Sequence, residues 1–143
     1  MKRITFAILL FAMIFALTGC ETTGSSRGAS KTCQSSNTSG SCTITIQEIE
    51  GTVSQKVENS SFRTAHREAE VTVNVTVGSG NLEVYVDGPN DQHSAVQVAP
   101  GGVATLTGSA TISGASERGF NIYFKAVDGK AGNIQAEMNY TVK

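Results

Sequence analysis

The sequence predicts an all-β protein: a small antiparallel β-sandwich of immunoglobulin-like or jelly-roll type, with about seven or eight strands, after a disordered N-terminal tether. Apolar and polar residues alternate along several short segments of residues 42–143, and Gly-rich turns separate these segments. No segment has a convincing helical period. Alternation, rather than continuous apolar runs, favours antiparallel sheets with one solvated face.

The N-terminus carries a targeting signal. Met1–Arg3 is positively charged, and the fourteen residues Ile4–Leu17 that follow contain no charge. A basic start followed by an apolar stretch of this length is typical of a signal peptide. A membrane-spanning helix needs about 20 apolar residues, so an uncleaved anchor is the less favoured alternative.

The apolar stretch ends in Leu17-Thr18-Gly19-Cys20. This tetrad resembles the lipobox of bacterial lipoproteins: an aliphatic residue, two small residues and a cysteine. The resemblance implies that residues 1–19 are removed as a signal peptide and that the Cys20 thiol receives a diacylglyceryl group. Further acylation of the new amino group would then give stable anchoring, because two or more acyl chains are needed for it. The expected partner is therefore a membrane, reached through the N-terminal lipid.

The same resemblance implies a location in the cell envelope. In enteric bacteria an Asp after the lipidated cysteine tends to retain a lipoprotein at the inner membrane, and Glu21 departs from that signal, which favours the outer membrane. Cleavage would remove Lys2 and Arg3 from 11 basic side chains against 12 acidic ones, so the formal charge would change from −1 to −3. A nucleic-acid partner is excluded on this basis, because it would require a strongly basic surface.

Residues 20–41 are almost entirely Ser, Thr, Gly and other small polar residues. Such a segment buries too little apolar surface to offset its ordering entropy, and it predicts a flexible linker from lipidated Cys20. A coil of this length spans about 25 Å, enough to hold a domain away from a lipid surface. The β-sandwich domain is expected to occupy residues 42–143.

Two cysteines remain once Cys20 is assigned to lipid. Cys33 and Cys42 are separated by eight residues, and an exported chain meets an oxidising compartment that favours disulfides. We expect a Cys33–Cys42 disulfide, with two free thiols or an intermolecular bond as alternatives. A metal site is disfavoured, since there is no CxxC spacing and no nearby histidine.

The domain divides into eight predicted strand segments. They are residues 42–47, 51–57, 70–77, 82–86, 93–99, 103–112, 120–127 and 134–142, with the sixth as one long strand or two short ones. The valine-rich 70–77 segment and the 82–86 segment flank the turn Gly78–Asn81, and we expect them to form a hairpin. Residues 59–66 have no assignable pattern.

Parts of the domain resemble a second family. The stretch "GNLEVYVDGP" and the closing "FNIYFKAVDGKAGNIQAEMNYTV" loosely resemble bacterial pre-peptidase C-terminal domains over about 70 residues, although Asn81 and Glu83 stand where that family often has Asp. The resemblance implies a non-catalytic accessory β-sandwich. The chain has no tryptophan, and its cysteine pair precedes the predicted strands, so an antibody-type core is not expected.

No motif indicates catalysis. The only histidines are His66 and His93, and no G-x-S-x-G elbow is present, so we predict no enzymatic activity, no catalytic residue and no cofactor. His93 follows Asp87 and Asp91, which raises calcium binding as an alternative. Their spacing does not match an EF-hand loop, and a solvated turn is the preferred interpretation.

The candidate binding residues are Tyr85, Tyr123 and Asn121. By strand parity both tyrosines point away from the apolar side of their strands. Exposed aromatic rings beside amides and charges bind sugars or protein partners, while the alternative is ordinary cross-strand packing. If the two strands are neighbours in one sheet, the rings form one patch.

These observations predict a lipid-anchored envelope protein that displays a non-enzymatic β-sandwich as a binding or structural module. One alternative is a glycan-binding module for cell-wall or surface polysaccharide, which a concave face with Tyr, Asn and Asp would favour. The other is an accessory subunit of an envelope, secretion or adhesion complex, which an open edge strand would favour. The oligomeric state is not predicted.

Overall fold

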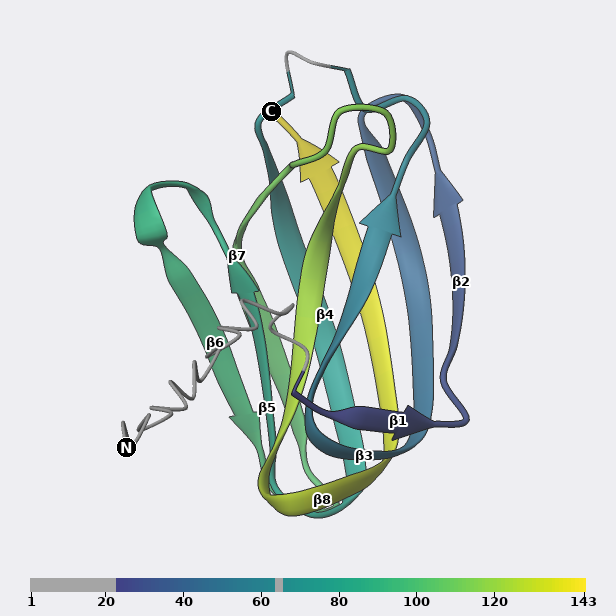
Figure 1. The fold of residues 1–143 in the computed structure, drawn as a ribbon, viewed down its shortest axis with the longest axis vertical. Helices are drawn as coiled ribbons and strands as arrows, with labels where there is room; N and C mark the ends of the chain where they lie inside the picture. Colours follow the sequence, from purple (N-terminus) through teal and green to yellow (C-terminus); the bar gives the residue numbers. More distant parts are fainter. Residues whose placement is uncertain (1–22, 64–65) are drawn as a thin grey trace, which may run out of the picture.

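The computed structural model describes residues 23–63 and 66–143, and within them the protein is a β-sandwich (Figure 1). The predicted signal peptide, 1–19, and Cys20 lie outside the described residues. The strands are β1 (Ser25–Arg27), β2 (Ser30–Ser35), β3 (Ser39–Glu58), β4 (Glu68–Ser79), β5 (Leu82–Asp87), β6 (His93–Val98), β7 (Val103–Thr111) and β8 (Gly119–Val142). A short 3₁₀ turn, η1 (Pro89–Asp91), precedes β6. No helix in the described part is long and apolar enough to cross a membrane.

Two long, bent strands join the layers. β3 has a register shift between Glu50 and Thr52, where Gly51 adopts φ 73°, and β8 bends near Gly129, with φ 99°. The first half of β3 therefore pairs with the second half of β8 in one layer, while the remaining halves pair in the other. Segments 42–47 and 51–57, predicted as separate strands, are one strand, and so are 120–127 and 134–142.

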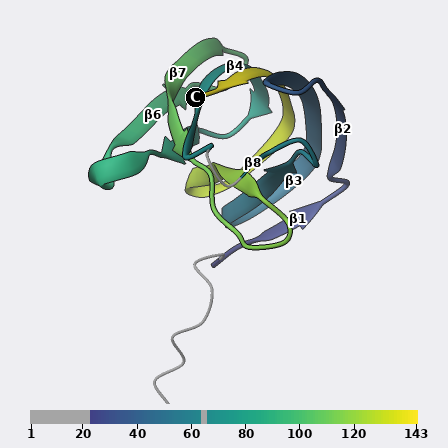
Figure 2. The ribbon, with the colours of Figure 1, turned by 90° about the horizontal axis from the view of Figure 1, so that it is seen from above.

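All pairings are antiparallel. One layer, which we call sheet I, contains β2, the first half of β3, the second half of β8, β4 and β7 in that order. The other layer, sheet II, contains the second half of β3, the first half of β8, β5 and β6. Seen from above, the strands of the two layers enclose the interior (Figure 2).

The predicted β4–β5 hairpin is wrong. β4 pairs with β7 and β8, whereas β5 pairs with β6 and β8. The turn after Ser79 carries the chain from sheet I to sheet II, so the two strands lie in different layers of the sandwich. Alternation of apolar residues identifies which side of each strand is buried, but hairpin partners and strands of facing sheets share that pattern.

The prediction of an unstructured linker is wrong for residues 25–35. β1 pairs with Glu48–Glu50 of β3, and β2 pairs with Gly40–Thr45 of β3. Every side chain of β2 is exposed, so this strand is joined to the sheet through its backbone and has no apolar alternation for sequence analysis to detect. The folded domain therefore starts before residue 42.

The predicted disulfide is confirmed: Cys33 and Cys42 are bonded. They are directly paired positions of β2 and β3, with Cα atoms 4.1 Å apart. Cys42 is buried and Cys33 is exposed, so the bond connects the edge strand to the core.

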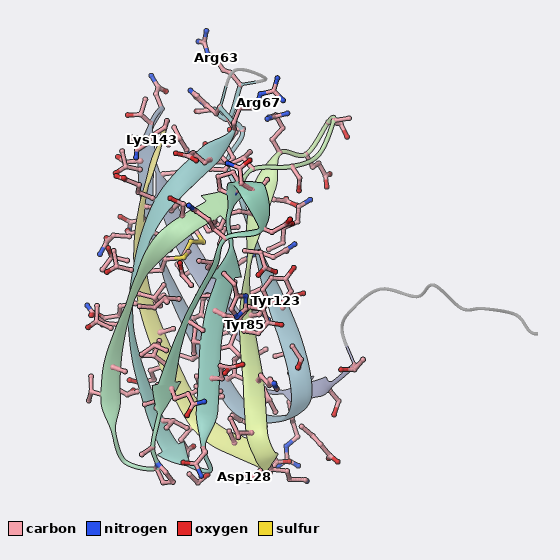
Figure 3. All side chains as sticks on the ribbon, turned by 90° about the vertical axis from the view of Figure 1, so that its left-hand side faces the viewer. Arg63, Arg67, Tyr85, Tyr123, Asp128 and Lys143 are labelled. Carbon is pink, nitrogen blue, oxygen red and sulfur yellow. A yellow bond between two sulfur atoms is a disulfide. The ribbon has the colours of Figure 1, made fainter. Side chains whose placement is uncertain are left out.

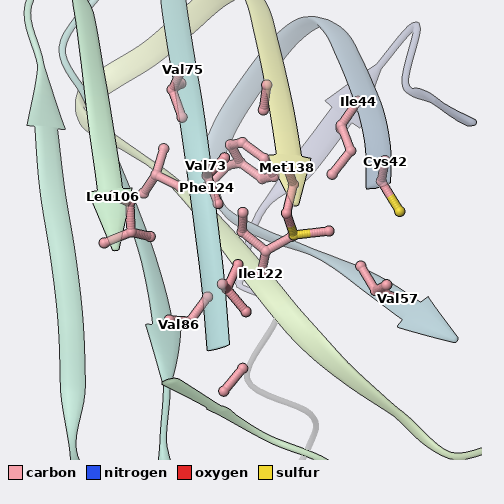
Figure 4. Packing of buried hydrophobic residues seen from close by; sticks show 14 of the residues in the cluster. Cys42, Ile44, Val57, Val73, Val75, Val86, Leu106, Ile122, Phe124 and Met138 are labelled. Atoms are coloured by element: carbon pink, nitrogen blue, oxygen red, sulfur yellow. The ribbon is translucent and has the colours of Figure 1, made fainter. Parts of the chain in front are cut away.

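The core forms between the inner faces of the two sheets (Figure 4). Sheet I contributes the valines of β4 with Ile44 and Met138, and sheet II contributes side chains such as Val86, Ile122 and Phe124. The alternating apolar residues of the predicted 70–77 and 82–86 segments are all buried: Val71, Val73, Val75, Val77, Leu82, Val84 and Val86. Residues 59–63, which follow β3, lie at one end of this core, where Phe62 contacts the rings of Phe120 and Tyr140.

Candidate binding face

The outer face of sheet II brings together all three predicted site residues. Tyr85 is directly opposite Tyr123, and Asn121 lies one outward position further along β8, opposite Lys56 of β3. We call this surface the tyrosine face. Its outward positions are Thr52, Ser54, Lys56, Glu83, Tyr85, Asp87, His93, Ala95, Gln97, Asn121, Tyr123 and Lys125.

The aromatic rings form a row across three strands. The rings of Tyr85 and Tyr123 stack, with centroids 4.7 Å apart and planes 8° from parallel. The His93 ring from β6 lies on the other side of Tyr85, 4.8 Å away and tilted by 43°. Stacking at this distance is favourable for aromatic pairs and holds the half-buried rings in place. Figure 3 shows both tyrosines side by side near the middle of the molecule.

Charged groups of both signs surround the rings. Lys125 pairs with Glu83 across β8 and β5, with Nζ and Oε1 3.7 Å apart, and Lys56 pairs with Glu58 at 2.7 Å. The hydrogen bond with Glu58 raises the pKa of Lys56, and the same bond lowers the pKa of Glu58. These opposite charges compensate one another, so the face has no strong attraction for a polyanion.

The histidine predicted for a solvated turn has a partner on this face. His93 Nδ1 lies 2.8 Å from Oδ1 of Asp87, its direct neighbour on β5. Asp91 belongs to η1, outside this pair. Within residues 23–63 and 66–143, no three His, Cys, Asp or Glu side chains gather in a group able to hold a metal ion.

An open hollow of about 580 Å³ lies on the tyrosine face, and its lining includes a residue that the sequence did not indicate. This residue is Thr23, from the start of the described chain, and it lines the hollow together with Tyr85, His93, Glu83 and Lys125. The sequence could not reveal this contact, because Thr23 lies in a polar segment without periodicity. Its position depends on β1, which fixes the chain beside the bend of β3.

The outer face of sheet I has a different composition. Its strands β8 and β4 and its edge strand β7 present threonines, amides and carboxylates: Glu70, Thr72, Asn74, Thr105, Thr107, Gln135, Glu137 and Asn139. Among the outward positions of these three strands in the described structure, only Val103 is a large exposed apolar residue, at the end of β7. The aromatic rings are therefore concentrated on the tyrosine face.

A second surface feature lies where the two sheets separate. β6 pairs with β5 and β7 pairs with β4, and an open hollow of about 600 Å³ lies between the two edges. His93 and Ser94 line one side of it, and Thr107 and Ser109 line the other. This seam is polar, and it contains no aromatic ring apart from the imidazole of His93.

Comparison with known proteins gives no assignment. No family model matches the chain, and no curated protein matches it. The resemblances to a lipobox and to pre-peptidase C-terminal domains remain predictions from the sequence.

Proposed function

We propose that this protein is a lipid-anchored component of a bacterial cell envelope, displaying a non-enzymatic β-sandwich whose contact surface is the tyrosine face. The observation that carries the proposal is the N-terminal pattern: a basic start, fourteen uncharged residues and then Leu17-Thr18-Gly19-Cys20. Cys20 would be the first residue of the mature protein and the site of lipidation. The outer membrane is the favoured location.

The fold supports a display module. Two stacked tyrosines on neighbouring strands are held in place by the sheet rather than by a loop, so they form a preorganised surface. Anchoring confines the protein to two dimensions, and a weak contact made by this surface would then be enough.

The described histidines support a non-enzymatic role. His93 Nδ1 lies within hydrogen-bonding distance of Asp87 Oδ1 on an open face, and His66 Nδ1 accepts a hydrogen bond from the backbone N–H of Arg63. Each ring is thus engaged in a local structural contact.

Metabolic labelling with a radioactive fatty acid tests the anchor. We expect the full-length chain, expressed in a bacterial host, to incorporate label and to fractionate with membranes. Mass spectrometry should find an acylated N-terminal peptide that starts at Cys20. Cys20→Ala should abolish labelling, whereas Cys33→Ser, which removes a different cysteine, should keep it.

Two results would contradict the proposal. One is a mature chain that retains residues 1–19, and the other is an unmodified N-terminus in protein recovered from the soluble fraction.

A further inference from the structure

The start of the folded domain lies at the margin of the tyrosine face. Gly24 packs so closely on the bend of β3 that a Cβ placed there would lie 2.4 Å from the carbonyl oxygen of Glu50 and 2.5 Å from the backbone nitrogen of Thr52. β1 then pairs with Glu48–Glu50. These contacts fix the chain at Thr23, and Thr23 lines the same hollow as Tyr85 and Lys125.

The distance from this point to the anchor is short. Three residue steps separate Cys20 from Thr23, and three residues reach about 10 Å at most when fully extended. A linker of about 20 residues would have held the domain at some distance from the lipid. Because β1 and β2 belong to the sandwich, that spacing is lost, and the hollow beside Thr23 lies within about 10 Å of the lipid-bearing residue.

The composition of the face suits an interface between lipid and water. Tyrosine rings prefer the headgroup region, where the ring is partly desolvated and its hydroxyl stays hydrated. Lysine side chains can lay their aliphatic stems on the surface while the ammonium group stays in water. Val127, two residues beyond Lys125 on β8, is 44% exposed and adds apolar area. The opposite outer face has threonines and amides in place of these rings.

We propose that the tyrosine face lies against the lipid surface in which Cys20 is anchored, so that its partner is the headgroup layer of that membrane. This proposal rests on the proposed function, because lipidated Cys20 brings the face to the bilayer. Charge does not drive the contact, since Lys56 and Lys125 are balanced by Glu58 and Glu83. The contact depends on tethering and should persist at high salt, unlike that of a polybasic segment.

The absence of tryptophan from the chain allows a direct test. Tyr85→Trp and Tyr123→Trp each place one reporter on the face, and Thr72→Trp places a matched reporter on the exposed outer face of sheet I. The lipidated full-length proteins are reconstituted into vesicles of phosphatidylethanolamine and phosphatidylglycerol that contain a headgroup spin label. We expect the quenching of tryptophan emission at positions 85 and 123 to be at least about twofold greater than at position 72, because interfacial rings lie at headgroup depth.

The outcomes separate this proposal from the proposed function. If the proteins float with the vesicles but quenching is equal at the three positions, or strongest at position 72, the orientation is wrong and the anchor stands. Flotation with unquenched rings and retention on insoluble envelope polysaccharide would likewise overturn it, in favour of glycan binding. If the proteins do not float, the lipid anchor itself is refuted and this inference fails with it.

A measurement on the unsubstituted protein covers the case in which a tryptophan variant does not fold. Lys125 and Lys143 have nearly equal side-chain exposure, 50% and 53%, but Lys143 lies at an end of the molecule away from the tyrosines (Figure 3). On vesicles, a bulky amine reagent should modify Lys125 several-fold less than Lys143, whereas a small reagent should modify both similarly. Equal modification by the bulky reagent would overturn the proposal.

Discussion

Tyr85 and Tyr123 are direct partners across β5 and β8, and their ring centroids lie 4.7 Å apart. Each ring therefore restrains the other, and His93 restrains Tyr85 from the opposite side. Both rings are half-buried on the sheet exterior, so removing the pair has a cost in stability as well as in contact area.

A double-mutant cycle measures that cost. We expect Tyr85→Ala and Tyr123→Ala to have a coupling energy of about 0.5–1 kcal/mol in urea unfolding, the range of cross-strand aromatic pairs. The double variant should keep the far-ultraviolet circular dichroism spectrum of the wild type, because the core side chains are on the other face of the sheet.

The matched control is the pair Thr72 and Thr107, which are direct partners on the outer face of sheet I. Their alanine cycle should give a smaller coupling energy. Equal coupling in the two cycles, or none between the tyrosines, would show that stacking adds nothing to stability.

Strand content and buried side chains were predictable here, but strand order was not. Alternation from Val71 to Val77 is complete, and all four valines are buried. The same pattern gave the wrong partner for β4, because a Gly-rich turn can close a hairpin or carry the chain to the facing sheet. β2 could not be found at all, since its six side chains are exposed and backbone pairing leaves no trace in composition.

The candidate site was predictable to a similar extent. Parity along β5 and β8 predicts that Tyr85 and Tyr123 point outward, but it does not determine that the two strands are neighbours, which the structure shows. The position of Thr23 beside the hollow depends on β1 folding over the bend at Gly51. This is a tertiary contact that leaves no local pattern in the sequence.

The Cys33–Cys42 bond should matter most for β2. A closed loop of this size stabilises a protein by about 2.5–3 kcal/mol in the chain-entropy model. β2 buries no side chain, so we expect reduction to raise amide exchange first in residues 30–35. Hydrogen exchange with and without dithiothreitol checks this.

The variant Cys33→Ser with Cys42→Ala is the control, because dithiothreitol should not change its exchange pattern. If β2 amides exchange equally slowly in the oxidised and reduced proteins, backbone pairing alone holds this strand and the prediction is wrong.

Gly80 should be the most sensitive turn glycine. It has φ 75°, and a Cβ placed there would lie 2.1 Å from the carbonyl oxygen of Lys130. Gly101 has φ 72°, and a Cβ placed there would have no neighbour within 4 Å. Both alanine substitutions incur the left-handed backbone cost of about 1–2 kcal/mol. Only Gly80→Ala adds steric overlap, which should lower the stability by a further amount of about 1–3 kcal/mol.

Urea unfolding of the two variants separates the backbone cost from the steric one. The midpoint of Gly80→Ala should fall below that of Gly101→Ala. Equal midpoints would mean that the crossing from sheet I to sheet II tolerates displacement of the Lys130 backbone.

Tyr140 links stability to pH at the closed end of the sandwich. It is 3% exposed, and its hydroxyl oxygen accepts a hydrogen bond of 3.1 Å from Asn59 Nδ2. Burial raises the pKa of Tyr140 above its ordinary value of 10.0, and the hydrogen bond from Asn59 opposes this in part. The folded state therefore retains the phenolic proton to higher pH than the unfolded chain does.

Because the folded pKa is the higher one, this contribution to stability is fully present below about pH 10 and is lost as the pH rises through the folded pKa.

Tyr140→Phe lacks the titrating group. At pH 8 it should be about 1 kcal/mol less stable than the wild type, from the lost hydrogen bond. That difference should narrow between pH 10 and pH 11. All other ionisable side chains are common to the two proteins, so their contributions cancel in the comparison. A difference in urea midpoint that stays constant from pH 8 to pH 11 would show that the Tyr140 hydroxyl ionises as freely in the folded protein as in the unfolded chain.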